Sequence, residues 1–341
     1  MNVDIERHWY QASLTLLTLF LLPFSWLFRA IVSLRRFLYR IKIKKSFRFP
    51  APVIVVGNIT VGGTGKTPFV LWLANTLRAA GYIPGIVSRG IGGEKHLEPY
   101  WVNAYADVRE VGDEAILLAK HGHCPVVICI DRVAAVKELL AKSSCNVVIC
   151  DDGLQHYRLQ RMLEIAMIDG ARHLGNQQLL PAGPLREPVS RLKQVDFIIR
   201  NSVSSKPENK TPKEFTMILQ GNVLVAVNDE AKRMPLNQFP HRKVHAVAAI
   251  GNPKRFFTML RECGFDVIEH PFPDHYFFRE DDLKFADDLP VIMTEKDAVK
   301  CHAFLGEKLW YIPVEVVVDD VLRQRILDAV NGGHTTRKER G

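Results

Sequence analysis

The sequence predicts an α/β protein: a mostly parallel β-sheet covered by helices on both faces, then a second, smaller α/β unit, all preceded by an apolar N-terminal helix. Three observations predict this. Short β-branched runs alternate with helical patterns between residues 50 and 170. A polar stretch, residues 201–215, then separates this series from a shorter one. A long uncharged stretch lies near the N-terminus, at residues 9–28.

The N-terminal segment, residues 1–45, is predicted to be helical and to associate with a membrane. Residues 9–28 carry no Asp, Glu, Lys or Arg, and their number is about what a bilayer core requires. The next residues repeat at helical spacing as a basic amphipathic helix, with apolar positions Ile31, Leu34, Leu38 and Ile41. Pro23 and neighbouring polar residues weaken the case for spanning. Spanning, lying in the interface, and a buried pair of helices in a soluble protein all stay open.

The net charge is concentrated in one segment. The formal charge of the chain is +8, and residues 29–48 hold eight Lys and Arg and no acid, so the rest sums to about zero. A nucleic-acid surface needs basic residues across the folded body, so no nucleic-acid partner is expected. The basic segment favours an anionic membrane surface instead. If the apolar segment spans, the positive flank places the folded body in the cytoplasm.

The main unit is predicted at residues 46–200, and its elements follow in order along the chain. Strands are indicated by continuous β-branched runs at 50–58, 82–90, 124–130, 146–153 and 163–170. Helices are indicated by apolar spacing and by turn residues at their ends, at 67–81, 111–122 and 132–143. Ligands of parallel sheets bind at the carboxyl ends of strands. Those ends carry the sequences GGTGKT, SRG, DDG and IDG.

The rest of the chain is predicted to form a linker, a smaller α/β domain and a tail. The linker is residues 201–215, because they are polar and without apolar period. The smaller domain is residues 216–330, with strand-like runs at 244–253, 265–270, 289–297 and 309–318 and a helix at 254–263. Residues 331–341 are predicted to be disordered.

The sequence TVGGTGKT, residues 60–67, predicts a phosphate-binding loop. It lies between a strand and a helix, where free backbone N–H groups attract anions. Lys66 would contact the terminal phosphates of a nucleotide and the Thr67 hydroxyl a magnesium ion. The usual pattern begins with Gly, whereas this loop has Thr60 there. The expected nucleotide contacts are Thr60, Val61, Gly62, Gly63, Thr64, Gly65, Lys66 and Thr67.

Two adjacent acids end the apolar run VVICDD. Asp151 and Asp152 have the form of the second nucleotide motif and would hold Mg²⁺ or its waters. Taken alone, they could equally cap a turn. The sequence VIMTEKD, residues 291–297, approaches a guanine-reading motif, but its Lys and Asp are adjacent, so guanine specificity is not expected.

A run of motifs then resembles a known family. In order they are GNITVGGTGKTP, GIVSRG, VGDEAILLA, DDGLQHYRLQR, GNQQLLPAGPLREP, AAIGNPKRFF, FPDHYFF and MTEKDAVK, over about residues 50–300. The chain resembles the tetraacyldisaccharide 4′-kinases, the lipid A 4′-kinases of Gram-negative bacteria. The resemblance implies a P-loop NTPase-type fold of two α/β/α domains with the active site between them. Two positions depart from the expected pattern, Ile91 in place of an aromatic and Met162 in place of Asp.

The resemblance also implies an activity. It is ATP-dependent phosphorylation, with Mg²⁺, of the 4′-hydroxyl of a tetraacylated glucosamine disaccharide 1-phosphate to give lipid IVA. The lipid acceptor implies an enzyme at the cytoplasmic face of the bacterial inner membrane, held there by residues 1–45. Two other classes stay open, a membrane-tethered NTPase switch and a peripheral scaffold that only binds nucleotide.

The resemblance assigns Asp113 and His275 as a catalytic pair, with Lys66 on the ATP phosphates. Asp113 would take or orient the acceptor proton and His275 would tune it. The residues alone do not support the pairing, because 162 positions separate the two. Taken alone, Asp113 is equally an acid in the first turn of a helix, and His275 a packed core histidine. Further residues could contact ATP or the lipid phosphate: Arg89, Gln155, His156, Arg172 and Arg186. The three arginines could equally make surface salt bridges.

Overall fold

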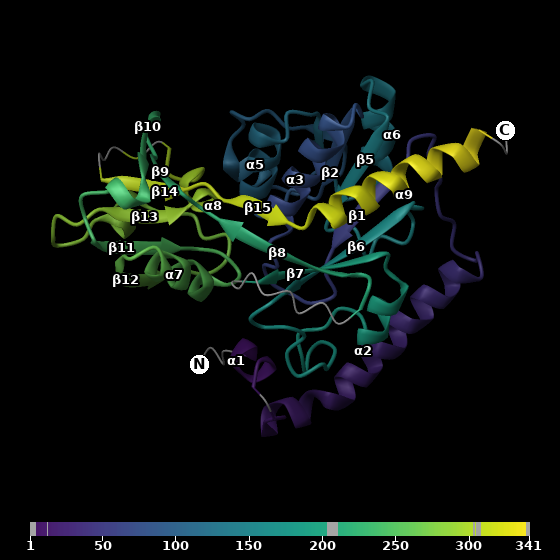
Figure 1. Cartoon of the computed structure of the whole chain (residues 1–341). Coiled ribbons are helices and arrows are strands. Elements are labelled where there is room, and N and C mark those ends of the chain that lie inside the picture. Colours follow the sequence, from purple (N-terminus) through teal and green to yellow (C-terminus); the bar gives the residue numbers. More distant parts are fainter. Residues whose placement is uncertain (1–4, 12, 203–210, 303, 305–307, 339–341) are drawn as a thin grey trace.

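The computed structural model describes residues 5–11, 13–202, 211–302, 304 and 308–338. Two β-sheets stand side by side (Figure 1), and each has helices packed on it. The helices are α1 (Ile5–Trp9), α2 (Leu16–Arg40), α3 (Lys66–Ala79), α4 (Val108–Val111), α5 (Asp113–His121), α6 (Arg132–Lys142), α7 (Pro253–Glu262), α8 (Glu295–Ala298) and α9 (Asp320–Lys338). Short 3₁₀ turns lie at Val189–Gln194, Leu236–Gln238 and Glu280–Leu283.

The larger sheet has nine strands in the order β15-β8-β7-β6-β1-β5-β2-β4-β3. Its strands from β8 to β4 are parallel, and only the edge strands β15 and β3 run antiparallel to their neighbours. The bounds are β1 (Val53–Gly57), β2 (Pro84–Ser88), β3 (Tyr100–Trp101), β4 (Val126–Ile128), β5 (Val147–Asp151), β6 (Leu163–Asp169), β7 (Phe197–Ser202), β8 (Glu214–Gln220) and β15 (Glu315–Val318). The predicted mostly parallel sheet is therefore confirmed.

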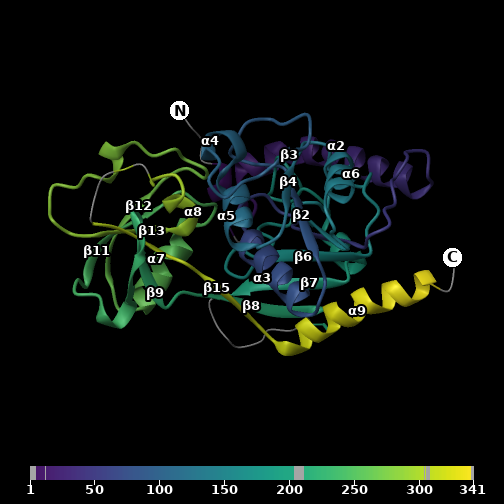
Figure 2. The same ribbon diagram turned by 90° about the horizontal axis from the view of Figure 1, so that it is seen from above.

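Helices cover both faces of this sheet, as the continuous apolar strands require. Side chains of a strand alternate between faces, so Val53 and Val55 of β1 point to one side and Ile54 and Val56 to the other. The first side packs against α6 and takes Phe28 of α2. The second side packs against α3 and the first half of α9. Figure 2 shows α3 and α9 on the side of the sheet away from α2.

The smaller sheet has six strands in the order β10-β9-β14-β13-β11-β12. Its bounds are β9 (Val223–Ala226), β10 (Asp229–Pro235), β11 (Lys243–Ala248), β12 (Asp266–Pro271), β13 (Val291–Thr294) and β14 (Leu309–Ile312). The four strands β14, β13, β11 and β12 are parallel. Helix α7 packs on one face, and α8 and the segment around Phe278 pack on the other.

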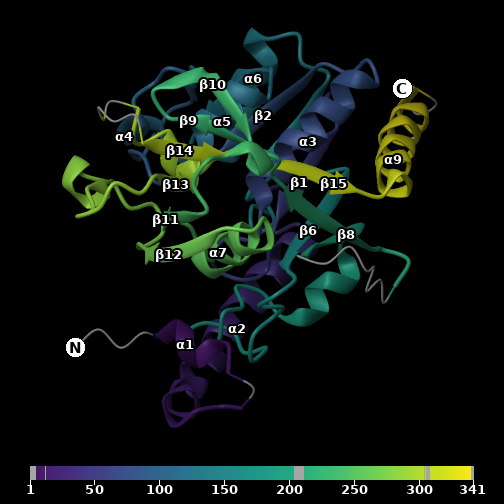
Figure 3. The same cartoon turned by 60° about the vertical axis from the view of Figure 1, so that its left-hand side comes forward.

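The chain crosses between the two sheets twice, which differs from the predicted linker. Asn201 and Ser202 belong to β7, and Glu214 and Phe215 belong to β8, so both ends of the predicted linker 201–215 are strands of the larger sheet. Residues 203–210 lie outside the described residues. The segment had the polar composition of a linker because β8 lies next to the sheet edge, where four of its seven residues are only partly buried and can be polar. The chain returns through β15 and α9, which also belong to the larger unit (Figure 3).

The predicted disordered tail is also corrected. Helix α9 continues to Lys338, and residues 339–341 lie outside the described residues. Leu322, Ile326 and Val330 of its first half are fully buried against the larger sheet. Once that half is fixed, further turns extend it at little cost, because helix propagation adds a hydrogen bond per residue.

The N-terminal segment contains α1 and α2. Helix α2 is the one helix within the described residues that is long and apolar enough to cross a membrane, with a mean hydropathy of 1.8 over its most apolar window. It continues through Pro23. Of its residues only Thr18 and Ser25 are buried, and Ser25 Oγ donates to the carbonyl of Leu179 at 2.7 Å. The same hydroxyl accepts from the amide of Ala182 at 2.9 Å, so α2 is attached to the body of the protein near its middle.

The packing of α3 on the larger sheet gives a test of the fold. Leu73 is completely buried there, and Leu73→Ala should lower the free energy of unfolding by about 2–5 kcal/mol, because the cavity cannot fully collapse. Leu97, which is 79% exposed, supplies the control, and Leu97→Ala should change it by less than about 0.5 kcal/mol. Urea titration of the detergent-solubilised protein measures both. Equal losses in the two variants would contradict the packing described.

Candidate active site

The predicted phosphate loop joins β1 to α3. Gly62 and Gly65 have left-handed backbones with φ of 91° and 82°, which only glycine adopts without strain. Asn58 holds the loop from inside: its Nδ2 donates to the carbonyl of Gly62 at 3.2 Å, and its Oδ1 accepts from Lys66 Nζ at 3.4 Å. At the start of the loop, Val61 donates its amide to Pro184 at 2.9 Å. The predicted glycine-containing loop between a strand and a helix is therefore present, and its nucleotide contacts stay a prediction.

The phosphate loop also contacts the smaller sheet. A Cβ added to Gly251, which follows β11, would collide with the backbone nitrogen of Gly63. Arg172 Nη1 donates to the carbonyl of Gly251 at 2.6 Å. Arg255 of α7 donates to the backbone oxygens of Asn201 and Ser202, at the end of β7. The backbones of the two units meet directly at the predicted nucleotide site.

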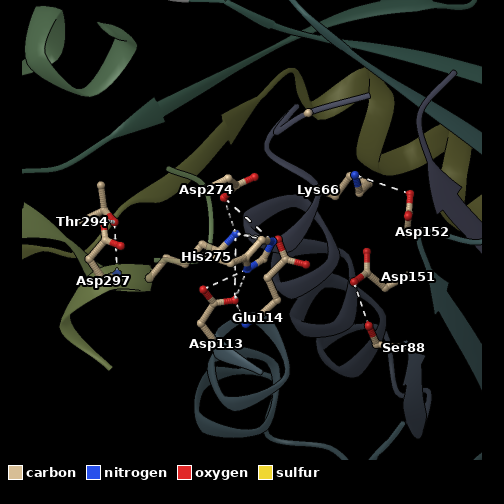
Figure 4. Close-up of polar contacts among 12 residues, drawn as sticks. Lys66, Ser88, Asp113, Glu114, Asp151, Asp152, Asp274, His275, Thr294 and Asp297 are labelled. Carbon is tan, nitrogen blue, oxygen red and sulfur yellow. Dashed lines mark hydrogen bonds and ion pairs between the residues drawn. The ribbon is translucent and has the colours of Figure 1, made fainter. Parts of the chain in front are cut away.

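Asp151 and Asp152 lie at the end of β5 beside this loop (Figure 4). Asp151 is buried, and its Oδ2 accepts from Ser88 Oγ at 3.1 Å while its Oδ1 has no hydrogen-bond partner. Burial, followed by repulsion from Glu114, raises the pKa of Asp151 to about 7. Asp152 forms ion pairs with Lys66 at 3.5 Å and with Arg186 at 3.2 Å. Burial would raise the pKa of Asp152, but these two cations hold it well below its ordinary value.

Asp113 and His275 meet across the cleft. Asp113 opens α5 of the larger unit, and His275 follows β12 of the smaller one. His275 Nδ1 lies 3.0 Å and 3.1 Å from the two carboxylate oxygens of Asp113. The side chain of Asp113 is 2% exposed and that of His275 22%. Gly92 lies beside the pair. A Cβ added to Gly92 would come 2.8 Å from Nδ1 of His275, so only a residue without a side chain fits there.

The two groups shift each other's titration. Burial would raise the pKa of Asp113, but the hydrogen bond from His275 and the charge of Lys296 lower it below its ordinary value. Burial would lower the pKa of His275, but the hydrogen bond to Asp113 raises it above its ordinary value. A carboxylate that stays ionised beside a basic imidazole can orient or accept the proton of a hydroxyl group.

Three of the five expected phosphate contacts lie near the predicted magnesium ligands or the loop. Arg186 pairs with Asp152, and Gln155 Nε2 donates to the carbonyl of Asn58 at 3.0 Å. Arg172 Nη1 lies 3.7 Å from the position of a Cβ on Gly62, and Arg172 also contacts Gly251 and the ring of Tyr10. It is therefore already engaged by protein groups.

His156 lines a second, smaller pocket of about 170 Å³, with Arg35 of α2, Arg132 of α6 and Arg158 around it. Arg132 is buried, and its Nε and Nη2 have no hydrogen-bond partner. Burial and the charges of Arg132, Arg89 and Arg35 lower the pKa of His156 to about 4. Arg89 is exposed and contributes to this positive field.

The main cleft between the units has a volume of about 490 Å³. The phosphate loop lines it from one side, and Gly251, Arg255 and Lys296 line it from the other. Apolar side chains of α7 and of the strand ends complete its far end, among them Phe256, Met259 and Ile312. It therefore offers an anion-binding floor and an apolar slot, as a nucleotide requires.

Comparison with known proteins decides the family. The family model described as tetraacyldisaccharide-1-P 4′-kinase matches residues 17–331. The chain belongs to the tetraacyldisaccharide-1-P 4′-kinase family. A tetraacyldisaccharide 4′-kinase of Coxiella burnetii is 51% identical over 314 residues, covering 92% of this chain and 91% of the relative. One of Methylobacillus flagellatus is 48% identical over 324 residues, covering 95% and 94%.

A solved structure agrees with this family. The crystal structure of the "apo" form of LpxK from Aquifex aeolicus in complex with ATP has a TM-score of 0.78 and 32% identity to this chain. It covers 92% of this chain, and all of that chain is matched. The fold predicted from the motifs is thereby confirmed. This member of the kinase family also contains site residues that sequence reasoning missed: Asn58, Glu114, Arg132, Asn201, Arg255, Lys296 and Lys300.

Signals for these missed residues were weak. Lys296 lies in MTEKD, which drew attention only as an imperfect guanine motif. Glu114 follows Asp113 directly, so its presence at the site is implied once Asp113 is placed. Arg132 reads as an ordinary residue opening an amphipathic helix. Only the tertiary structure shows that its guanidinium is buried and turned toward His156.

The contact between His275 and Asp113 predicts the pH dependence of one side chain. In Asp113→Asn the pKa of His275 should fall, because the variant loses both the hydrogen bond to a carboxylate and the negative charge of Asp113. Since the folded-state pKa of His275 is raised, its imidazolium adds stability below the unfolded value of about 6.5, and this is lost as pH rises through the folded value. NMR titration of ¹⁵N-histidine-labelled protein, assigned with His275→Gln, measures the shift. An unchanged pKa would contradict the pairing.

Proposed function

We propose that this chain transfers the γ-phosphate of ATP to the 4′-hydroxyl of a tetraacyldisaccharide 1-phosphate, forming lipid IVA in lipid A biosynthesis. The observation that carries the proposal is the cleft itself. A phosphate-binding loop forms one wall, and an Asp–His pair built from both units lies beside it. Family membership identifies the class of acceptor.

Lys66 and the backbone amides of the loop would hold the phosphates of ATP. Lys66 is already placed between Asn58 and Asp152, so its ammonium is oriented before the nucleotide arrives. Phosphoryl transfer depends mainly on such positioning and on neutralising charge at the transferred group. The remaining donors are the amides at the N-terminus of α3, whose dipole favours anions.

The residues at the end of β5 fit a magnesium ion bound together with ATP. Mg²⁺ takes oxygen ligands and is usually held by one or two carboxylates plus phosphates and waters. Asp151 supplies a buried carboxylate oxygen that lacks a partner, and the Thr67 hydroxyl lies in the first turn of α3. Asp152 is balanced by Lys66 and Arg186, so it suits contact through water. Within the described residues no three His, Cys, Asp or Glu side chains gather as a self-contained metal site. When bound, the ion would neutralise charge on the phosphates.

Asp113 and His275 would accept the proton of the attacking hydroxyl. The hydrogen bond between Nδ1 of His275 and the carboxylate of Asp113 holds the two side chains in place. The side chain of His275 remains 22% exposed, so a hydroxyl group can reach the pair. The new O–P bond forms as the bond from Pγ to the β-phosphate oxygen breaks, and ADP leaves. The proton remains on the pair until it is released to solvent.

The basic pocket around His156 would take the 1-phosphate of the acceptor. Buried guanidinium nitrogens without partners are costly, and an anionic ligand would satisfy them. Arg132 provides two such nitrogens, and Arg35 reaches the same pocket from the membrane-associating helix. His156 remains neutral at pH 7 and can donate one hydrogen bond there. Of the expected phosphate contacts, His156 and Arg89 are therefore assigned to the lipid, and Arg186 and Gln155 to the nucleotide side.

Helix α2 would lie in the cytoplasmic surface of the inner membrane. Arg35 and Arg36 contact Gln155 and Gln194, and Ser25 contacts the loop at Leu179, so one side of the helix is held against protein. Because one side of α2 is held against the protein along its length, the helix fits a position in the membrane interface better than one across the bilayer. Its other side exposes large apolar residues: Leu16, Leu19, Phe20, Phe24, Trp26, Leu27, Ile31, Leu34 and Phe37.

The transferase activity is tested with γ-³²P-ATP and tetraacyldisaccharide 1-phosphate in detergent. Label should move to the lipid, Asp113→Ala should lower the rate by about 10²–10⁴-fold, and Lys66→Ala by at least about 10²-fold. The exposed residues Asp288 and Lys284 supply controls, and their alanine variants should keep wild-type rates. Phosphate released to water from folded protein, without labelled lipid, would support an NTPase switch instead.

The membrane assignment is tested with the triple variant Phe20→Ser, Phe24→Ser, Leu27→Ser. Recovery on vesicles of phosphatidylethanolamine and phosphatidylglycerol should fall more than tenfold, because burying each apolar side chain contributes about 1.5–3 kcal/mol. ATP binding should be unchanged, since these side chains are exposed on α2. Ile83→Ser, at another exposed apolar position, should bind vesicles normally. Unchanged recovery of the triple variant would exclude this face as the membrane contact.

A further inference from the structure

Lys296 occupies a central place that the roles assigned above do not explain. It belongs to α8 of the smaller unit and lines the main cleft, and its side chain is 16% exposed. Its Nζ lies 3.0 Å from Glu114 Oε1 and 3.9 Å from Asp113 Oδ1, both on α5 of the larger unit. It also lies 3.4 Å from Asp274 Oδ1 and 3.5 Å from His275 Nε2. One ammonium therefore contacts both members of the Asp113–His275 pair and two further carboxylates beside it.

The ammonium of Lys296 opposes protonation of His275. A lysine ammonium has three protons and no lone pair, so it can only donate. Its contact with Nε2 at 3.5 Å is favourable only when Nε2 carries no proton. The remaining proton of a neutral imidazole is then on Nδ1, where it is donated to Asp113 at 3.0 Å. Burial would lower the pKa of Lys296, but Glu114, Asp113 and Asp274 raise it above its ordinary value, so the group stays charged.

Without this cation His275 would lie between two carboxylates. Asp113 is on its Nδ1 side, and Asp274 Oδ1 lies 3.8 Å from its Nε2. Two flanking carboxylates favour the doubly protonated imidazolium. An imidazolium has no unprotonated ring nitrogen left, so His275 could not help the pair to accept the proton of the acceptor hydroxyl. Lys300, which lies 3.6 Å from Asp113 Oδ2 and 2.7 Å from Asp297, balances Asp113 from behind but does not separate Asp274 from His275.

We propose that Lys296 is a positioning residue for phosphoryl transfer: its ammonium beside Nε2 disfavours the doubly protonated form of His275, so that the Asp113–His275 pair can accept the hydroxyl proton. This rests on the proposed catalytic role of that pair. Because Lys296 comes from the smaller unit and Asp113 from the larger, the pair is ready to accept a proton only when the two units are in contact.

The test is the pH profile of kcat for Lys296→Met, measured in the full-length detergent-solubilised protein. The ascending limb should move to higher pH by about one unit or more, as expected for loss of a charge within 4–6 Å. The rate should therefore fall about tenfold at neutral pH and recover as the pH is raised. The KM for ATP should be unchanged. Lys296→Arg retains the charge and should keep the wild-type profile, as should Lys284→Met on the exposed surface.

A second variant, Asp274→Asn, should have the opposite effect on the pH profile. It removes the carboxylate beside Nε2 and should move the ascending limb to lower pH. Combined with Lys296→Met, it should return the limb toward the wild-type position. Asp274 is 35% exposed, so this variant tests the proposal even where Lys296→Met fails to fold.

Three outcomes would overturn the inference. A loss of kcat that is equal at every pH would make Lys296 a structural residue. An unchanged limb with a raised KM for ATP would make it a nucleotide contact. An unshifted ascending limb of the pH profile in Asp274→Asn would show that the carboxylate of Asp274 does not affect the protonation of His275. Failure of the proposed catalytic pair is distinguished separately, because Asp113→Ala would then retain transfer.

Discussion

The site depends on the contact between two glycines. Gly63 of the phosphate loop and Gly251 of the smaller unit approach so closely that any side chain on Gly251 would strike the loop backbone. The contact sets the distance between the units and hence between the N-terminus of α3 and the Asp113–His275 pair, which the two units build together. A displacement of about 1 Å at a reacting centre can cost on the order of 10²-fold in rate. Arg172, which donates to Gly251, fixes the same contact.

Charge balance is the second constraint. The site gathers five carboxylates, and so many close together cannot all stay ionised without cations. They are Asp113, Glu114, Asp151, Asp152 and Asp274 (Figure 4). Lys66, Lys296 and Lys300 supply positive charge from three separate elements. Asp151 is the exception: no lysine or arginine among the described residues forms an ion pair with it, and its pKa is raised to about 7. Under the proposed function, its unpaired carboxylate is the group best suited to ligate a divalent cation that arrives with ATP.

Much of this arrangement could be predicted because strand ends in a parallel sheet meet at one edge. That rule alone brings the phosphate loop, Asp151 and Asp152 together, and the motif order identifies the family. It could not show the meeting of Asp113 with His275, which depends on how the two units pack. Nor could it assign β8 and β15 to the larger sheet, because local patterns do not say which sheet a strand joins. Lys296 was missed because a lysine in a strand-to-helix turn has no signature of its own.

Helix α2 and the predicted nucleotide site share a common support. Glu187 is buried and accepts from Gln155 and Tyr157, and Arg36 of α2 lies 3.8 Å from it. Its neighbour Arg186 holds Asp152. The buried carboxylate of Glu187 therefore links α2 to Gln155, which donates to the carbonyl of Asn58 below the phosphate loop. A residue on α2 and a residue beside the predicted nucleotide site thus share one buried acid.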